Sequence, residues 1–301
     1  MEIKVAGQAG YCYGVERALR LTDAAAENTR KKPIFTLGPI IHNPQVVESF
    51  VARGVNPIDG IDEVRSGTII VRTHGVDPLV IEQAAEKGLA VVDATCPFVA
   101  KAQQRAAELV RDGYNLVIIG EKEHPEVAGI LAHARGEATV VEKAADAARV
   151  KGRKPLGVVV QTTQSMENFQ QIVAVLAAKV SELKVFNTIC SATTRRQDAA
   201  KKLAEEADMM IVVGGKNSAN TSRLVQICLA TGTATHHIET ANELDPAWFA
   251  DINVVGLTAG ASTPQWLLKE VISRLEEMKD GRSGPLMGSD MGSDMGSGRA
   301  L

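Results

Sequence analysis

Short apolar runs alternate along this chain with longer stretches in which apolar residues recur every three or four positions. The short runs are typical of strands buried on both faces, and the longer stretches of helices with one buried face. Strands are expected at residues 3–5, 33–37, 67–72, 91–95, 115–120, 138–141, 156–160, 208–213, 235–238 and 254–257. Helices are expected at residues 16–27, 45–53, 78–87, 97–111, 166–180, 194–207 and 264–279, with another that begins at 221. Strands that alternate with helices predict parallel sheets flanked by helices.

Three cysteines occupy the same kind of position in this pattern. Cys12, Cys96 and Cys190 each end an extended segment and precede a helix, and they lie 84 and 94 residues apart. Pro97 supports the second junction, because proline is favoured in the first turn of a helix. The free N–H groups and the dipole at a helix start favour a thiolate. The spacing predicts a three-fold internal repeat.

Polar residues follow the strands of each repeat at matched distances from its cysteine. Those found 30, 28 and 30 residues after the three cysteines are His42, His124 and Asn220. Those found 62, 66 and 72 residues after them are His74, Thr162 and Ser262. Ligands of parallel sheets bind beyond the carboxyl ends of the strands. We therefore expect an α/β fold of three similar parallel-sheet units in a pseudo-three-fold, trefoil-like arrangement around a central cluster.

The repeat also predicts how the chain is divided. Residues 1–12 form an N-terminal strand and the first cysteine position, which pack with the third unit, and the three units span 13–96, 97–189 and 190–280. From 281 to 301 the sequence is rich in Gly, Ser and Met and contains MGSD twice. Such a segment is expected to be a disordered tail or an artificial addition.

Composition narrows the class of protein. Of 301 residues, 45% are hydrophobic, and the net charge of −3 comes from interspersed signs, so neither a nucleic-acid partner nor a membrane span is expected. The N-terminus lacks an export signal, which favours the cytoplasm. Four cysteines in such a chain do not indicate a disulfide framework. Cys228 lies in an amphipathic pattern and is expected in the core.

The three remaining cysteines suit iron better than zinc. Structural zinc sites usually have four ligands at close spacing. A [4Fe–4S] cluster held by three cysteines leaves one iron free to bind a substrate oxygen while the cluster supplies electrons. The polar groups around it favour an anion, either a diphosphate or a polycarboxylate, and we expect protonated histidines to supply the positive charge. Glu126, two residues after His124, is the expected proton donor.

Nine motifs carry a resemblance to a known family: residues 10–15 (GYCYGV), 41–43 (IHN), 73–76 (THGV), 93–97 (DATCP), 124–127 (HPEV), 161–163 (QTT), 188–193 (TICSAT), 216–220 (KNSAN) and 258–262 (TAGAS). In this order they resemble the LytB-type 4-hydroxy-3-methylbut-2-enyl diphosphate reductases, which act last in the non-mevalonate pathway of isoprenoid synthesis. The match runs from residue 3 to about residue 278.

The resemblance implies one [4Fe–4S] cluster on Cys12, Cys96 and Cys190, with the allylic hydroxyl of the substrate on the free iron. It implies a diphosphate site made of His42, His74, His124, Ser218, Ala219, Asn220 and Ser262. Thr162 would lie by the hydroxyl and Glu126 would deliver protons, while ferredoxin or flavodoxin supplies two electrons to give isopentenyl or dimethylallyl diphosphate. Ala219 stands where many relatives have serine, so only its backbone N–H is left to reach the phosphate.

Two other functions fit a three-cysteine cluster. A hydro-lyase would use the cluster as a Lewis acid without electrons. An iron–sulfur redox sensor would carry the cluster without a phosphate pocket. The need for a reductant and the response of the cluster to diphosphate separate these alternatives from the reductase.

Overall fold

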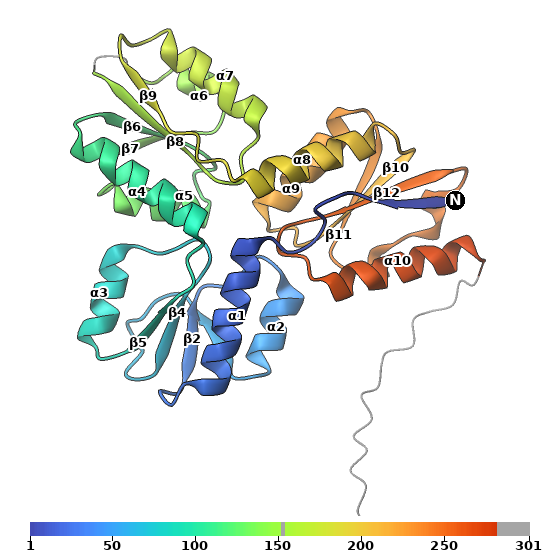
Figure 1. Cartoon of the computed structure of the whole chain (residues 1–301), viewed down its shortest axis with the longest axis horizontal. Coiled ribbons are helices and arrows are strands. Elements are labelled where there is room, and N and C mark those ends of the chain that lie inside the picture. The colour runs from blue at the N-terminus through green and yellow to red at the C-terminus, as the bar shows by residue number, and fades with distance from the viewer. Residues whose placement is uncertain (152–153, 282–301) are drawn as a thin grey trace, which may run out of the picture.

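Three parallel sheets flanked by helices make up residues 1–151 and 154–281, which this computed structural model describes. Each sheet has four strands, and all strand pairs within this part of the chain are parallel. The sheets and their helices form three lobes around a common centre (Figure 1). This confirms the predicted α/β class and the trefoil-like arrangement of three units.

The first two units have the same strand order. In the first sheet the order is β3 (Val55–Ile58), β2 (Ile34–Leu37), β4 (Thr68–Val71) and β5 (Ala90–Asp93). The helices of this unit are α1 (Tyr13–Asn28), α2 (Pro44–Val51) and α3 (Pro78–Glu86). In the second sheet the order is β7 (Ala138–Val141), β6 (Asn115–Ile119), β8 (Leu156–Val160) and β9 (Leu183–Val185). The helices of this unit are α4 (Pro97–Arg111), α5 (Pro125–His133), α6 (Ala144–Ala147) and α7 (Met166–Ala177).

The third sheet is completed by the first strand of the chain. Its order is β11 (Ala234–Ile238), β10 (Met209–Val213), β12 (Val254–Ala259) and β1 (Glu2–Val5). The helices of this unit are α8 (Ser191–Ala204), α9 (Ala219–Ala230) and α10 (Gln265–Lys279), with short 3-10 turns η1 (Ala241–Glu243) and η2 (Pro246–Phe249). In every unit the edge strand that closes the sheet (β5, β9 or β1) therefore leads directly to one of the three cysteines.

Two of the strands were not predicted, and both lie at sheet edges. β3 contains Pro57, which lacks the N–H that an inner strand would need. β9 has only three residues, too few for a hydrophobic pattern. The helix α5 was also missed, although Pro125 and Glu126 are typical of a helix start.

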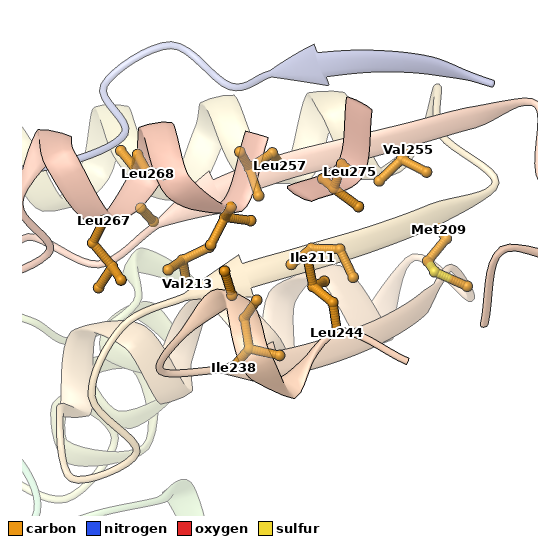
Figure 2. Packing of buried hydrophobic residues seen from close by; sticks show 13 residues of the cluster. Met209, Ile211, Val213, Ile238, Leu244, Val255, Leu257, Leu267, Leu268 and Leu275 are labelled. Atoms are coloured by element: carbon orange, nitrogen blue, oxygen red, sulfur yellow. The ribbon is translucent and has the colours of Figure 1, made fainter. Parts of the chain in front are cut away.

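The inner strand β10 shows how each sheet is buried on both faces. Met209, Ile211 and Val213 point to one face, where they pack against leucines of α10 (Figure 2). Met210 and Val212 point to the other face, where α8 and α9 cover them. Cys228 belongs to this second cluster and is fully buried, which confirms that it is a core residue.

Two further predictions concern the ends and the environment of the chain. No helix in residues 1–151 and 154–281 combines the length and the apolar character needed to cross a bilayer. The predicted tail at 281–301 lies outside the described residues, except for Gly281.

Candidate active site

The three cysteines lie at equivalent backbone positions near the centre of the molecule. Each is the residue before the first turn of a helix, α1, α4 or α8. The N–H groups of Cys12, Cys96 and Cys190 donate to the carbonyl oxygens of Ala261, Thr73 and Thr162, at 3.2, 3.0 and 3.1 Å. The three acceptors lie two residues after β12, β4 and β8, respectively. The loop after each of these strands therefore holds the backbone of one cysteine. By this register Thr162 corresponds to Thr73, one position before His74.

Two of the three thiols, those of Cys12 and Cys96, lie close to Gly14, where a larger residue would meet them. A Cβ on Gly14 would lie 2.5 Å from Cys96 Sγ and 3.9 Å from Cys12 Sγ. Burial raises the pKa of the Cys96 thiol to about 11. The N–H groups of Phe98 and Val99 act against this rise in the pKa of Cys96, and negative charge on Cys12 and Cys190 would add to it.

A buried arginine, Arg196, lies beside the thiols, and its role was not predicted. Arg196 Nε donates to Gln8 O at 2.9 Å and Nη2 donates to Gly10 O at 2.7 Å. Burial lowers the pKa of Arg196, whereas the charges of Cys12 and Cys190 raise it. The guanidinium therefore joins α8 to the loop before Cys12 and places positive charge next to two thiols.

Three imidazoles from two units form a cluster that lines the same cavity as Cys12 and Cys96. The ring centroids of His42 and His74 are 4.6 Å apart, those of His74 and His124 are 5.4 Å apart, and those of His42 and His124 are 5.8 Å apart. Burial lowers the pKa of His42 and His124 to about 4 and that of His74 well below its usual value. The positive charge of Arg72 lowers all three pKa values further.

These pKa values alter the expected source of positive charge. Desolvation favours the neutral form of the three imidazoles as long as no anion is bound, so the predicted protonated histidines are not the source of charge in that state. Arg72, the residue after β4, supplies the nearby charge, and the sequence pattern did not single it out. An anion that enters the cluster would favour protonation of the imidazoles.

The hydrogen bonds of the histidines favour an anion over a metal ion. Their ring nitrogens lie within 4.8 Å of one another, close enough for a shared metal. However, His124 Nδ1 accepts the N–H of Glu126 at 3.1 Å, so in the neutral ring Nε2 carries the proton and is a donor. Both ring nitrogens of His42 and Nδ1 of His74 are buried without a partner among the described residues. Such groups are typical of a site for a hydrogen-bonding ligand.

The third unit contributes the start of α9 and the loop after β12. Ser218 is the residue before α9, and its Oγ accepts the N–H of Thr221 at 3.3 Å. The amide of Asn220 is buried, and neither its oxygen nor its nitrogen has a partner in the described part of the chain. Ser262 Oγ donates to His42 O at 2.9 Å, which ties the third unit to the first. The first turn of a helix is a favourable place for a phosphate.

Glu126 is fully buried, and its carboxylate accepts two hydrogen bonds from one residue. Thr162 donates twice, from its N–H to Glu126 Oε1 at 2.6 Å and from its hydroxyl to Glu126 Oε2 at 2.8 Å. Burial raises the pKa of Glu126 to about 7 in spite of these two hydrogen bonds, and the charge of Glu121 adds to the rise. A carboxyl group with such a pKa exchanges protons readily near neutral pH.

This pKa predicts how stability depends on pH. Because the folded pKa is about 7 and the ordinary value is 4.5, the folded protein holds the proton more tightly than the unfolded chain. The part that Glu126 contributes to the free energy of unfolding should therefore fall by about 3 kcal/mol as the pH rises from about 4.5 to about 7. The lowered pKa values of His42, His74 and His124 act in the opposite direction in wild type and variant alike, so the difference between the two proteins isolates Glu126. Denaturant unfolding of the metal-free protein at several pH values measures this, with Glu126→Gln as the reference that lacks the group. Parallel curves for the two proteins would contradict the prediction.

Most residues predicted for the site line one central pocket. Apart from Cys190, which lies next to it, all of them border it: Cys12, His42, His74, Cys96, His124, Glu126, Thr162, Ser218, Ala219, Asn220 and Ser262. Thr163 also lines the pocket and was not predicted, because the spacing placed the polar stop one position earlier. The roles of these residues remain predictions.

The fold and the site together define a class, an α/β protein whose three similar units meet around three cysteines and a pocket lined by buried polar side chains. The sequence model of the LytB protein family matches residues 3–276. The chain belongs to the LytB family.

Named relatives are similar to this chain over their whole length. The chain is 49% identical over 284 residues to the 4-hydroxy-3-methylbut-2-enyl diphosphate reductase of Geobacter sulfurreducens, covering 94% of this chain and 100% of that protein. It is 48% identical to the enzyme of the same name from Geobacter metallireducens, with 94% and 100% covered.

Two solved structures are also similar. One, of (E)-4-hydroxy-3-methyl-but-2-enyl diphosphate reductase, is 45% identical with a TM-score of 0.67 and covers 92% of this chain and 100% of that chain. The other, E-1-hydroxy-2-methyl-but-2-enyl-4-diphosphate reductase from Plasmodium falciparum, is 30% identical with a TM-score of 0.87, with 90% and 87% covered. The predicted family is confirmed, and the chain is an oxidoreductase, as predicted.

Proposed function

We propose that this chain reduces 4-hydroxy-3-methylbut-2-enyl diphosphate to isopentenyl and dimethylallyl diphosphate, the last step of the non-mevalonate pathway. The substrate gains two electrons and two protons and loses its hydroxyl as water. The observation that carries the proposal is one pocket that is lined by two thiols, three imidazoles and the Glu126–Thr162 pair, with the third cysteine, Cys190, bonded through its N–H to Thr162 O. The names of the relatives suggest the substrate.

The thiols of Cys12, Cys96 and Cys190 would hold a [4Fe–4S] cluster. Three units present one thiol each, Gly14 leaves room between two of them, and the helix starts and Arg196 balance negative charge. Bound there, the cluster supplies the electrons and a Lewis-acidic iron for the substrate oxygen. Ferredoxin or flavodoxin is the proposed electron donor. The cytoplasm is the proposed location, since the four cysteines are free thiols.

The anion pocket would bind the diphosphate end of the substrate. His124 donates from Nε2, the amide of Asn220 and the hydroxyls of Ser218 and Ser262 lie around the same space, and His42 supplies a ring without a partner in the described structure. His42 and Asn220, whose buried polar atoms have no partner in the described structure, would each gain a hydrogen bond when a phosphate enters, which removes the cost of leaving them unpaired. The hydroxyl of Ser262 would exchange its bond to His42 O for one to the phosphate. Ala219 would contribute only its backbone N–H.

Glu126 would hold the proton that releases the hydroxyl as water. Its pKa of about 7 allows it to carry a proton when substrate binds and to take up another afterwards. The hydroxyl of Thr162, 2.8 Å from Glu126 Oε2, lines the pocket and would pass the proton to the substrate oxygen.

Gly14→Ala tests the proposed cluster site. The added Cβ would lie 2.5 Å from Cys96 Sγ, so the thiol must move and the cluster should be held about 10- to 100-fold less tightly. Iron per chain after anaerobic desalting measures this. Gly7→Ala is the matched control, because no atom lies within 4 Å of a Cβ there. Equal iron in both variants would contradict the proposed arrangement.

The reaction itself is tested with anaerobic, cluster-loaded protein and the allylic diphosphate. We expect turnover only when a reductant is present, together with a change in the spectrum of the cluster when the diphosphate binds. Turnover without reductant would favour the hydro-lyase. A cluster whose spectrum does not respond to the diphosphate would favour the redox sensor.

A further inference from the structure

The loop that carries Thr162, residues 161–165 between β8 and α7, is held by several side chains of its own unit. Gln161 Oε1 accepts the N–H of Glu121 at 2.9 Å, and Gln161 Nε2 donates to Thr163 Oγ1 at 2.8 Å. Asn168 Nδ2 donates to Gln164 Oε1 at 3.1 Å. Gln161 and Gln164 are buried, so these contacts are shielded from water. The loop is thus tied to the segment that leads from β6 to Glu126.

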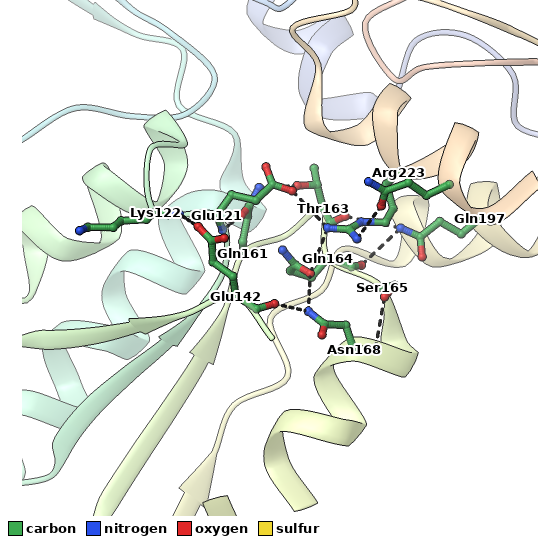
Figure 3. Close-up of polar contacts among 11 residues, drawn as sticks. Glu121, Lys122, Glu142, Gln161, Thr163, Gln164, Ser165, Asn168, Gln197 and Arg223 are labelled. Carbon is green, nitrogen blue, oxygen red and sulfur yellow. Dashed lines mark hydrogen bonds and ion pairs between the residues drawn. The ribbon is translucent and has the colours of Figure 1, made fainter. Parts of the chain in front are cut away.

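The third unit reaches the same loop with two side chains (Figure 3). Gln197 of α8 donates from Nε2 to Gln164 O at 3.3 Å and to Thr163 O at 3.5 Å. Arg223 of α9 donates from Nη2 to Gln164 Oε1 at 3.4 Å and to Glu121 Oε1 at 3.1 Å. Arg223 therefore contacts both of the segments that meet in the Glu126–Thr162 pair.

Arg223 also belongs to the helix that borders the anion pocket. It lies three residues after Asn220, and side chains three apart are neighbours on one face of a helix. Asn220 lines the pocket, whereas Arg223 points to the second unit. One turn of α9 thus connects the anion pocket to the two segments that hold the proposed acid.

We propose that Arg223 is a positioning residue that fastens the anion-binding helix α9 to the two segments carrying Glu126 and Thr162. The inference rests on the proposed function, since it is the reduction that needs the diphosphate and the acid in register. The side chain of Arg223 is 20% exposed and that of Glu121 39% exposed. Water reaches the Glu121 end of this ion pair and weakens it, so we expect its loss to act mainly on the local geometry of the two segments.

The order of the loop is measured first, by amide hydrogen exchange of the whole ligand-free chain. Arg223→Gln should raise exchange in residues 161–165 several-fold and leave the midpoint of thermal unfolding almost unchanged. Arg53→Gln is the matched control, since it removes an ion pair of 2.6 Å to Asp23 within the first unit. Unchanged exchange at 161–165 in Arg223→Gln would overturn the proposal.

Kinetics with the cluster-loaded enzyme then distinguish positioning from a merely structural role. Misplacement of reacting groups by about 1 Å costs up to about 10²-fold, so Arg223→Gln should lower kcat about tenfold or more and also raise KM. Arg223→Lys should restore part of kcat, because it keeps the charge but not both hydrogen bonds.

Two outcomes of the kinetics overturn different claims. Wild-type kcat and KM in an Arg223→Gln enzyme with a loosened loop would overturn the positioning role alone. A wild type without reductase activity would overturn the proposed function and this role in it, whatever the exchange data show.

Discussion

Glu126→Gln is expected to lower kcat by about 10²- to 10⁴-fold, the usual contribution of a general acid. Glutamine has nearly the same shape, and its Oε1 can still accept the N–H of Thr162, which lies 2.6 Å from the carboxylate oxygen. The glutamine side chain, however, cannot release a proton. The loss should therefore fall on kcat, whereas substrate affinity and iron content stay close to those of the wild type.

Glu123→Gln is the control for this prediction. Glu123 is an exposed glutamate on the same segment, three residues before Glu126, and it does not line the pocket. Steady-state kinetics with a chemical reductant, iron analysis and binding of inorganic diphosphate make the comparison complete. An active Glu126→Gln enzyme would exclude Glu126 as the proton donor, and a loss of diphosphate binding would assign it a role in affinity instead.

The site was predictable from the sequence because its residues follow strands. A parallel sheet brings the carboxyl ends of its strands to one edge, so matched spacing from Cys12, Cys96 and Cys190 was enough to place polar residues such as His42 and Ser262 near a common centre. The fold class was predictable for the same reason, since alternation of strands and helices determines parallel pairing.

What the sequence did not indicate depends on contacts between distant segments. Arg196 is placed by carbonyl oxygens 186 and 188 residues away, and Arg223 by a carboxylate 102 residues away. The neutral state of the histidines follows from burial and from the charge of Arg72, which no local pattern reports. The short edge strands β3 and β9 owe their pairing to their neighbours rather than to their own residues.

Replacement of any one of Cys12, Cys96 and Cys190 by serine is expected to cause the largest loss of activity. Soft thiolates select iron–sulfur clusters, and a serine hydroxyl is a much poorer ligand. A lost Lewis acid is worth several kcal/mol, so turnover should fall by about 10³-fold or more. Iron and sulfide analysis of anaerobically prepared protein should show the loss directly.

The three variants should behave alike, since each cysteine has the same place in its junction and the same backbone hydrogen bond. Cys228→Ser provides the contrast: it buries a hydroxyl among apolar side chains of α8, α9 and β10, so it should lower stability and leave iron content unchanged. A cluster that joins three units should also raise the midpoint of thermal unfolding relative to the metal-free protein. Among the four serine variants, only Cys228→Ser should show this increase. If one of the three site variants keeps its full iron content, that cysteine is not a ligand of the cluster, because loss of a ligand should lower the iron content.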